Sequence, residues 1–248
     1  MQLHLLTWME VEDYLKTSQG IIVPIGSTEQ HGPMGLIGTD CICPGVIAER
    51  VGREEGVLVG PTISLGMAQH HLAFPGTISL RPSTLIALLK DYVGSLSRNG
   101  FRRFYFLNGH GGNIATVQSA FAEIYAGQSF LANPESRDIR CKLTNWYDLP
   151  EVAELARELY ADKEGHHATP SEVSVTQFAY PDHIKQAELG ELTPYHRFPT
   201  DAVDFRNCFP DGRMQSDSSL ARPEHGERLV ERCVTAVKRD YADYLKAS

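Results

Sequence analysis

Short apolar runs alternate with amphipathic stretches along this chain, and most of the runs end at a cluster of glycine and polar residues. Buried strands are expected at the apolar runs 21–25, 56–60, 101–107 and 139–144, which are too short for helices. Apolar residues at helical spacing predict helices near 44–52, over 84–98 with Ser83 as N-cap, from about 114 to 125, at 171–179 and at 222–245. Strands that alternate with helices are typical of an α/β fold, in which helices cover both faces of a mostly parallel sheet.

The chain is expected to form a single domain over residues 1–248, because no repeat or low-complexity linker interrupts this pattern. Its 42% apolar content is enough to bury a full core. One segment, 181–221, is rich in Pro, Gly, Asp and Ser and has little periodicity. Irregular segments of this length often cover active sites or form subunit contacts, so two roles are open for it.

The composition of the chain argues against some classes of partner and some cellular locations. A formal charge of −8 without a basic stripe argues against nucleic acid or an anionic membrane as a partner. No apolar run reaches about 18 residues, and no cationic region precedes an apolar core at the N-terminus, so neither a spanning helix nor a signal peptide is expected. The five cysteines form an odd, scattered set, which favours free thiols and a cytoplasmic location.

Three polar clusters lie at the predicted junctions between strands and helices. They hold Glu29, His31 and Asp40 in the first, His110 within 108–113 in the second, and His167 and Glu172 within 165–172 in the third. A parallel sheet brings such junctions together along one edge. Imidazoles and carboxylates are ligands of divalent metals, and the neighbouring glycines let the backbone approach a metal or substrate closely.

Each cluster also has an ordinary structural explanation. Glu29 and His31 alone are as easily a solvated loop, and Asp40 is placed to cap the next helix. The glycine-rich run 109–113 is compatible with a turn or an anion-binding nest, and Glu172 with a first-turn carboxylate that complements a helix dipole. Caps alone do not explain three such clusters at junctions, so metal binding is the favoured interpretation.

Three motifs carry a resemblance. They are Gly-Ser-Thr-Glu-Gln-His-Gly-Pro with Gly-Thr-Asp over 26–40, Asn-Gly-His-Gly-Gly-Asn at 108–113, and His-Ala-x-x-x-Glu-x-Ser at 167–174. They resemble the motifs of the creatininase (creatinine amidohydrolase) family, and His70-His71 with Phe-Pro-Gly-Thr at 74–77 also fits, although a packed turn explains that segment equally well. The resemblance covers about residues 5 to 240. It implies a three-layer α/β/α fold, two divalent metal ions per subunit (zinc, manganese or iron) and a homo-oligomer, often a hexamer.

By motif position, the resemblance also implies roles for single residues. The implied metal ligands are Glu29, His31, Asp40, His110 and Glu172, with Asp40 bridging the two ions. His167 would be the catalytic residue that transfers protons, and Glu172 would act with it at the reacting centre.

Two departures from the family pattern affect these assignments. Gly112 stands where creatinine-hydrolysing members have a metal-bound glutamate, and Thr169-Pro170 stand where Gly-Glu is usual. The first departure argues against creatinine as the substrate. It also makes Glu172 the more plausible ligand of the second metal.

The interpretation is a metal-dependent amidohydrolase that cleaves the C–N bond of a small cyclic amide or formamide, with a hydroxide bridging two divalent ions as nucleophile. His167 would accept a proton from the water and return it to the leaving nitrogen. Asn108 or Asn113 is expected to hydrogen-bond the ligating imidazoles. Two alternatives are a non-catalytic module that binds a nucleotide or phosphate at 109–113, and a single-metal peptidase. The metal and the substrate are left open.

Overall fold

A parallel sheet of three strands lies at the centre of the computed structural model, which describes residues 1–130, 138–194, 196–197 and 199–247. The strand order is β1 (Gly20–Ile25), β2 (Arg103–Asn108) and β3 (Arg140–Asn145). Ile25 pairs with Asn108, and Asn108 pairs with Asn145, so all three strands end at the same level. The segments that follow the strands therefore start from one edge of the sheet.

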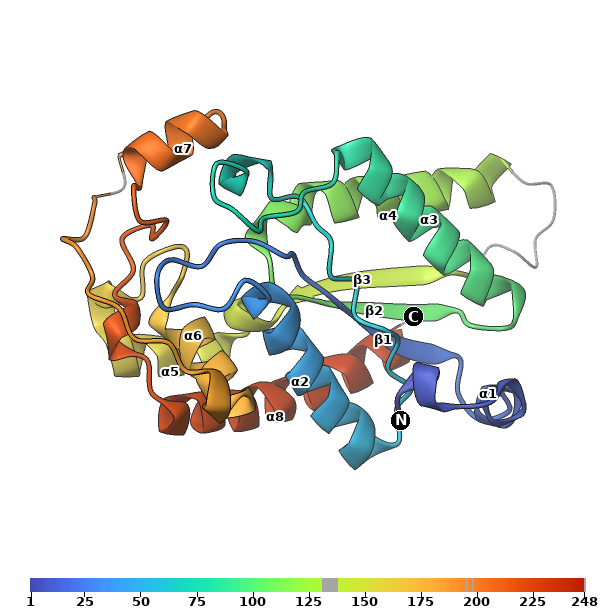
Figure 1. The fold of residues 1–248 in the computed structure, drawn as a ribbon. Coiled ribbons are helices and arrows are strands. Elements are labelled where there is room, and N and C mark those ends of the chain that lie inside the picture. The colour runs from blue at the N-terminus through green and yellow to red at the C-terminus, as the bar shows by residue number, and fades with distance from the viewer. Residues whose placement is uncertain (131–137, 195, 198, 248) are drawn as a thin grey trace.

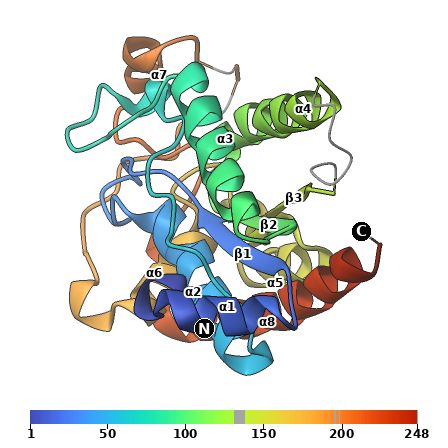
Figure 2. The same ribbon diagram turned by 90° about the vertical axis from the view of Figure 1, so that its right-hand side faces the viewer.

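Helices cover both faces of this sheet (Figures 1 and 2). The helices are α1 (Trp8–Leu15), α2 (Thr39–Glu55), α3 (Pro82–Arg98), α4 (Ile114–Phe130), α5 (Pro150–Tyr160), α6 (Pro170–Ala179), α7 (Ala202–Cys208) and α8 (Pro223–Ala247). In Figure 1, α3 and α4 lie above the sheet, and α2, α5, α6 and α8 lie below it. The three-layer α/β/α prediction is confirmed.

Alternation along the strands separates the core into two halves. Ile21, Val23 and Ile25 face α3 and α4, together with Phe104 and Phe106 of the next strand. The intervening residues, Ile22, Tyr105 and Leu107, pack on the other face against α2, α5, α6 and α8. Because a strand exposes successive side chains to opposite faces, a continuous apolar run is what a sheet covered on both sides requires.

The prediction of a regular strand at 56–60 is wrong. The segment runs parallel beside β1 and makes two ladder bonds, Ile22 N–H to the Leu58 carbonyl (3.0 Å) and Gly60 N–H to the Ile22 carbonyl (2.8 Å). It forms only isolated bridges, at Val59 and again at Ile63. Pro24 in β1 has no N–H to donate at this edge, which interrupts the ladder.

Two helix starts also differ from the prediction. α2 begins at Thr39 instead of near residue 44, and it accommodates Pro44 in its first turns. α3 begins at Pro82, and its flanking residue Arg81 makes no side-chain cap bond, so Ser83 is inside the helix and is not its N-cap. Proline suits the first helical position because its missing N–H has no partner there in any case.

The five cysteines are unpaired, as expected, and Cys43 is fully buried. None of the helices in the described ranges is long and apolar enough to cross a membrane.

Candidate metal centre

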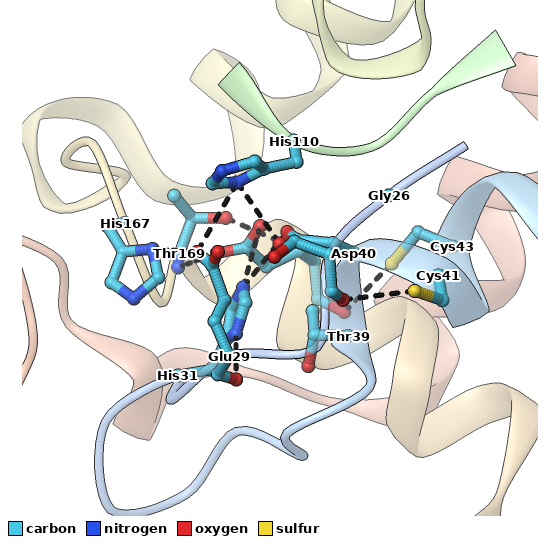
Figure 3. A network of polar contacts seen from close by, with 12 residues as sticks. Gly26, Glu29, His31, Thr39, Asp40, Cys41, Cys43, His110, His167 and Thr169 are labelled. Carbon is cyan, nitrogen blue, oxygen red and sulfur yellow. Dashed lines mark hydrogen bonds and ion pairs between the residues drawn. The ribbon is translucent and has the colours of Figure 1, made fainter. Parts of the chain in front are cut away.

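Asp40 lies where the first turn of α2 meets the carboxyl ends of two strands. Gly26 follows β1 and Gly109 follows β2, and a Cβ on either residue would come within 2.1 Å of the Asp40 carbonyl oxygen. Glycine is therefore needed at both positions for α2 to approach the sheet. Gly38 is the N-cap of α2, so Asp40 does not occupy the cap position, contrary to the simpler explanation of its role. Figure 3 shows it among imidazoles instead.

Glu29 is fully buried and lies among three histidines. Its backbone N–H donates to the Ile37 carbonyl (2.9 Å), which closes the loop after β1. Its Oε1 atom lies 3.2 Å from His71 Nε2, 3.3 Å from His110 Nδ1 and 3.7 Å from His167 Nδ1. Residues 29, 71, 110 and 167 come from four separate segments, so tertiary packing alone brings them together.

A second group of ligand atoms shares Asp40 with the first. His110 Nδ1 lies 3.1 Å from Asp40 Oδ2, whereas His31 Nε2 lies 3.2 Å from Asp40 Oδ1. His31 Nε2 also lies 3.8 Å from Glu172 Oε2. The two oxygens of Asp40 therefore face two different histidines.

Glu172 uses its two carboxylate oxygens differently. Oε1 accepts a hydrogen bond from the Thr169 N–H (2.6 Å), and the Thr169 hydroxyl accepts one from the Glu172 N–H (3.3 Å). This reciprocal capping box starts α6. Oε2 is directed to His31. Glu172 therefore caps the start of α6 with one oxygen and is placed to bind a metal with the other.

The site passes a chemical test for divalent metal. Candidate ligand groups, each with one donor atom per residue within 4.8 Å of the others, are Glu29–Asp40–His110, His31–Asp40–Glu172 and Glu29–His31–His167. Both oxygens of Glu29 and Oδ2 of Asp40 are buried and accept no hydrogen bond in the described part of the chain. Leaving such oxygens unsatisfied is costly, and a cation would satisfy them. The mixture of imidazoles and carboxylates suits zinc, manganese or iron.

The charges of the centre shift the pKa values of its members. Burial would lower the pKa of His31, but the carboxylates of Asp40 and Glu172 outweigh it and raise that pKa to about 10. Glu29 and Asp40 similarly overcome burial at His110 and raise its pKa to about 9. Burial would raise the pKa of Asp40, but the two imidazoles hold it well below its usual range. Burial raises the pKa of Glu29. Without a cation, the buried carboxylates retain protons on the neighbouring histidines.

The prediction that Asn108 or Asn113 hydrogen-bonds the His110 ring is wrong. Its outer nitrogen Nε2 contacts the Met67 carbonyl (3.0 Å). Asn113 acts one step away, because its Oδ1 accepts from the Met67 N–H (3.0 Å) and its Nδ2 donates to the Gly26 carbonyl (2.9 Å). Asn108 holds the His110 backbone through the His110 carbonyl (2.7 Å). Both asparagines therefore position the backbone around His110, and the Met67 carbonyl contacts its ring.

The contacts of Gln30 indicate which ring nitrogens of His167 and His71 carry a hydrogen. His167 Nε2 lies 2.8 Å from the backbone carbonyl oxygen of Gln30 and 2.9 Å from its side-chain amide nitrogen. The carbonyl can only accept, and the amide donates to the Gly212 carbonyl (3.0 Å), so we assign the hydrogen to Nε2, which leaves Nδ1 bare. The Gln30 side-chain amide nitrogen lies 2.9 Å from His71 Nδ1 and donates to it, so the hydrogen of His71 is on Nε2; this nitrogen lies 3.2 Å from Glu29 Oε1 without forming a hydrogen bond. Burial lowers the pKa of both rings. The bare Nδ1 of His167 faces Glu29 and the centre.

The segment before α6 has a strained backbone at Ala168, the residue after His167. Ala168 has φ = 56°, which is unusual for a residue other than glycine. His167 is fixed by its N–H to Ser216 Oγ (3.3 Å) and by its carbonyl, which accepts from the Met214 N–H (3.3 Å). Met214 and Ser216 belong to the irregular stretch 181–221, so one role of that stretch is to position His167.

His71 and Gln30 were not among the predicted site residues. His70 and His71 form the short helix Gln69–His71, and both are buried. The His71 ring stacks on His167 (centroids 4.2 Å apart) and meets the edge of Phe205 from α7 (4.4 Å). The paired histidines next to a Phe-Pro-Gly-Thr run were the available signal for this position. For Gln30 the signal was its place between two expected ligands.

The centre opens into a cleft of about 750 Å³. Its lining includes Asp40, His110, His167 and Glu172, with Trp146 and Tyr147 after β3 and Arg157 on α5. A cleft of this size next to buried ligand groups is suited to a small organic substrate.

Comparisons with known proteins agree with this geometry. Residues 4–240 match the family described as Creatininase, creatinine amidohydrolase. The chain is 27% identical over 252 residues to the creatinine amidohydrolase of Pseudomonas putida, which covers 94% of this chain and 92% of that protein. It is 37% identical over 239 residues to the mycofactocin precursor peptide peptidase of Mycolicibacterium smegmatis, covering 88% and 84%. A solved structure described as "Creatininase Mn" has a TM-score of 0.82 at 25% identity, covering 98% and 97%. Fold, ligand groups and family match lead to one conclusion: this chain belongs to the creatininase family and is a metal-dependent amidohydrolase.

Proposed function

We propose that this protein, acting as a single domain over residues 1–248, hydrolyses the C–N bond of an amide at a centre of two divalent ions. One ion would be held by Glu29, Asp40 and His110, and the other by His31, Asp40 and Glu172. The observation that carries the proposal is the shared Asp40, whose two oxygens face His31 and His110. A single-metal peptidase would leave one of these two groups without a use.

Two bound ions would supply Lewis-acid chemistry, polarising the amide carbonyl and making a water molecule more acidic. His167 is suited to take the proton of that water, because its Nδ1 is bare and its Nε2–H is tied to Gln30. Burial lowers the pKa of His167, which favours release of that proton to the leaving nitrogen. The ring stacking on His71 keeps His167 in place during this transfer.

We propose a small cyclic amide or a formamide as the substrate class. Gly112 supports a substrate other than creatinine, because the carboxylate that creatinine-hydrolysing members carry at this position is absent. A peptide is a second candidate, supported by the 37% identity to a peptide peptidase and by the volume of the cleft. A phosphate ligand is not favoured, because Glu29, Asp40 and Glu172 would repel it.

The direct test is metal content and turnover in His110→Ala and Glu172→Gln. Glutamine can still complete the α6 capping box, so the second variant removes charge and keeps the helix start. Elemental analysis is expected to find at least one ion per subunit fewer in each variant. Activity is measured on a panel of creatinine, N-formyl compounds, cyclic amides and short peptides. On the substrate that the wild type hydrolyses, kcat of each variant is expected to fall about 100-fold or more. His183→Ala, an exposed histidine outside the cleft, is the control. Two ions per subunit and full activity in both variants would refute the assignment.

We also propose a homo-oligomer, a hexamer by family resemblance, in a reducing compartment such as the cytoplasm. Three side chains near the N-terminus support a subunit contact: Leu5, Trp8 and Met9 are 71%, 71% and 58% exposed. The five unpaired cysteines support a reducing environment. A monomer in sedimentation equilibrium at micromolar concentration would rule out the assembly.

A further inference from the structure

Tyr147 lines the cleft, but it belongs to neither ligand group nor to the proton route. It lies in the short helix Trp146–Asp148 directly after β3. Its ring meets Trp146 edge to face, with centroids 5.9 Å apart at 82°, and packs on the core beneath the sheet. The ring is therefore held firmly while the residue borders the cleft beside His110 and Glu172.

The Tyr147 hydroxyl has an unused hydrogen-bond donor. No residue in the described ranges accepts its proton. A Cβ placed on Gly111 would lie 3.5 Å from this hydroxyl oxygen, so the hydroxyl is next to the turn that carries His110. A fixed phenol with a free donor beside the candidate ligands is arranged to meet a polar atom of a bound molecule.

The surroundings keep this phenol neutral. Burial and then the negative charges of Asp148, Asp40 and Glu172 raise the pKa of Tyr147 far above its ordinary value. The hydroxyl therefore keeps its proton at neutral pH and can act as a hydrogen-bond donor.

We propose that the Tyr147 hydroxyl donates a hydrogen bond to the carbonyl oxygen of the bound amide and stabilises the negative charge that develops there. This inference rests on the proposed amide hydrolysis. When the water oxygen bonds to the carbonyl carbon, the C=O π pair moves onto the carbonyl oxygen. When the C–N bond breaks, that pair restores the C=O bond, and the leaving nitrogen takes the proton held by His167. Tyr147 keeps its own proton throughout.

Tyr147→Phe tests the proposal, because it removes one oxygen and keeps the ring. In the manganese-loaded enzyme, kcat on the responsive amide is expected to fall about 100-fold, the usual effect of removing one such donor, while KM changes a few-fold at most. Metal content and Tm should stay at the wild-type values. Tyr92→Phe is the matched control, since the Tyr92 hydroxyl is also unpartnered but is buried beside Gly60, outside the cleft.

A second measurement does not need turnover. Acetohydroxamate presents a carbonyl oxygen to a bound divalent ion, and calorimetric titration into the manganese-loaded protein measures its affinity. Tyr147→Phe should weaken this binding about tenfold, as expected for one lost hydrogen bond. Values of kcat and acetohydroxamate affinity within twofold of wild type would overturn the proposal. If wild type hydrolyses none of the amides but the variant still binds acetohydroxamate more weakly, the proposed function fails and the Tyr147 donor stands.

Discussion

At the scale of single residues, the absence of a side chain at Gly112 is as important to the centre as the ligands themselves. A Cβ on Gly112 would lie 2.4 Å from His110 Nε2 and 2.6 Å from the Met67 carbonyl oxygen. These are the two atoms that contact each other at 3.0 Å and orient the His110 ring. A glutamate, as in the motif of creatinine-hydrolysing members, cannot occupy position 112 without displacing this contact. Glu172 offers a carboxylate to the same centre from a different element.

Gly112→Ala is therefore expected to turn the His110 ring and weaken metal binding about 10- to 100-fold, as loss of a partner behind a ligand usually does. Competition with a chelator of known affinity measures the effect. Gly94→Ala is the control, because a Cβ on Gly94 would meet nothing within 4 Å in the interior of α3. That variant should be neutral or more stable by up to about 1 kcal/mol. Equal metal affinity in both variants would contradict this account of Gly112.

At the scale of elements, the start of α6 joins helix formation to ligand placement. Thr169 and Glu172 cap the helix reciprocally, and the same carboxylate presents Oε2 to His31. The start of α1 carries an equivalent capping box of Thr7 and Glu10, far from the cleft. Among the described helices, α1 and α6 thus start with the same capping box, and the one at α6 lies next to the centre.

Thr169→Ala should lower the free energy of unfolding by about 1 kcal/mol, because the Glu172 N–H loses the hydroxyl that accepts its hydrogen bond. It should also weaken metal binding: the Thr169 N–H can still donate to Glu172 Oε1, but the first turn of α6 that carries this carboxylate is less firmly held. Thr7→Ala should cost a similar amount of stability and leave metal affinity unchanged. Urea unfolding and metal competition measure the two quantities for each variant. If both variants have the same metal affinity, the α6 cap has no part in placing Glu172.

At the scale of the whole molecule, the fold concentrates three carboxylates and several imidazoles at one buried edge of the sheet. Gln30 and His71 organise the histidines around Glu29, and the 181–221 stretch contributes Phe205, Met214 and Ser216. Such a cluster destabilises the protein unless protons or cations neutralise it. Protons and metal therefore compete for the same side chains.

The metal-free protein should lose stability as the pH rises from about 6.5 to about 10. The folded-state pKa values of His31 and His110, about 10 and about 9, lie above the unfolded value of 6.5. Their contribution is fully present below pH 6.5 and disappears as each ring loses its proton, which amounts to about 1 kcal/mol or more over this window. The manganese-loaded protein should show a much smaller slope, because its ligating rings are neutral throughout. Parallel slopes with and without chelator in Tm measurements would contradict the metal assignment.

Local signals explain why much of the fold was predictable. Apolar runs and helical spacing predicted β1, β2, β3 and most helices, because a sheet covered on both faces needs continuous apolar strands. No helix was predicted at α1, α5 or α7. Two other failures came from longer-range effects. Pro24 interrupts the ladder that the 56–60 segment would otherwise complete, and packing onto Gly26 and Gly109 extends α2 back to Thr39. Neither effect is visible in the periodicity of the segment concerned.

The sequence by itself determined the α/β class, the family resemblance and the set of candidate ligands, because residue type and motif spacing are local properties. Only the tertiary structure decided how these residues combine: that Asp40 faces His31 with one oxygen and His110 with the other, that Gln30 orders His167 and His71, and that a Met67 carbonyl holds His110. These contacts join residues 9 to 137 positions apart. Their distances depend on how helices pack on the sheet, which no single stretch of sequence specifies.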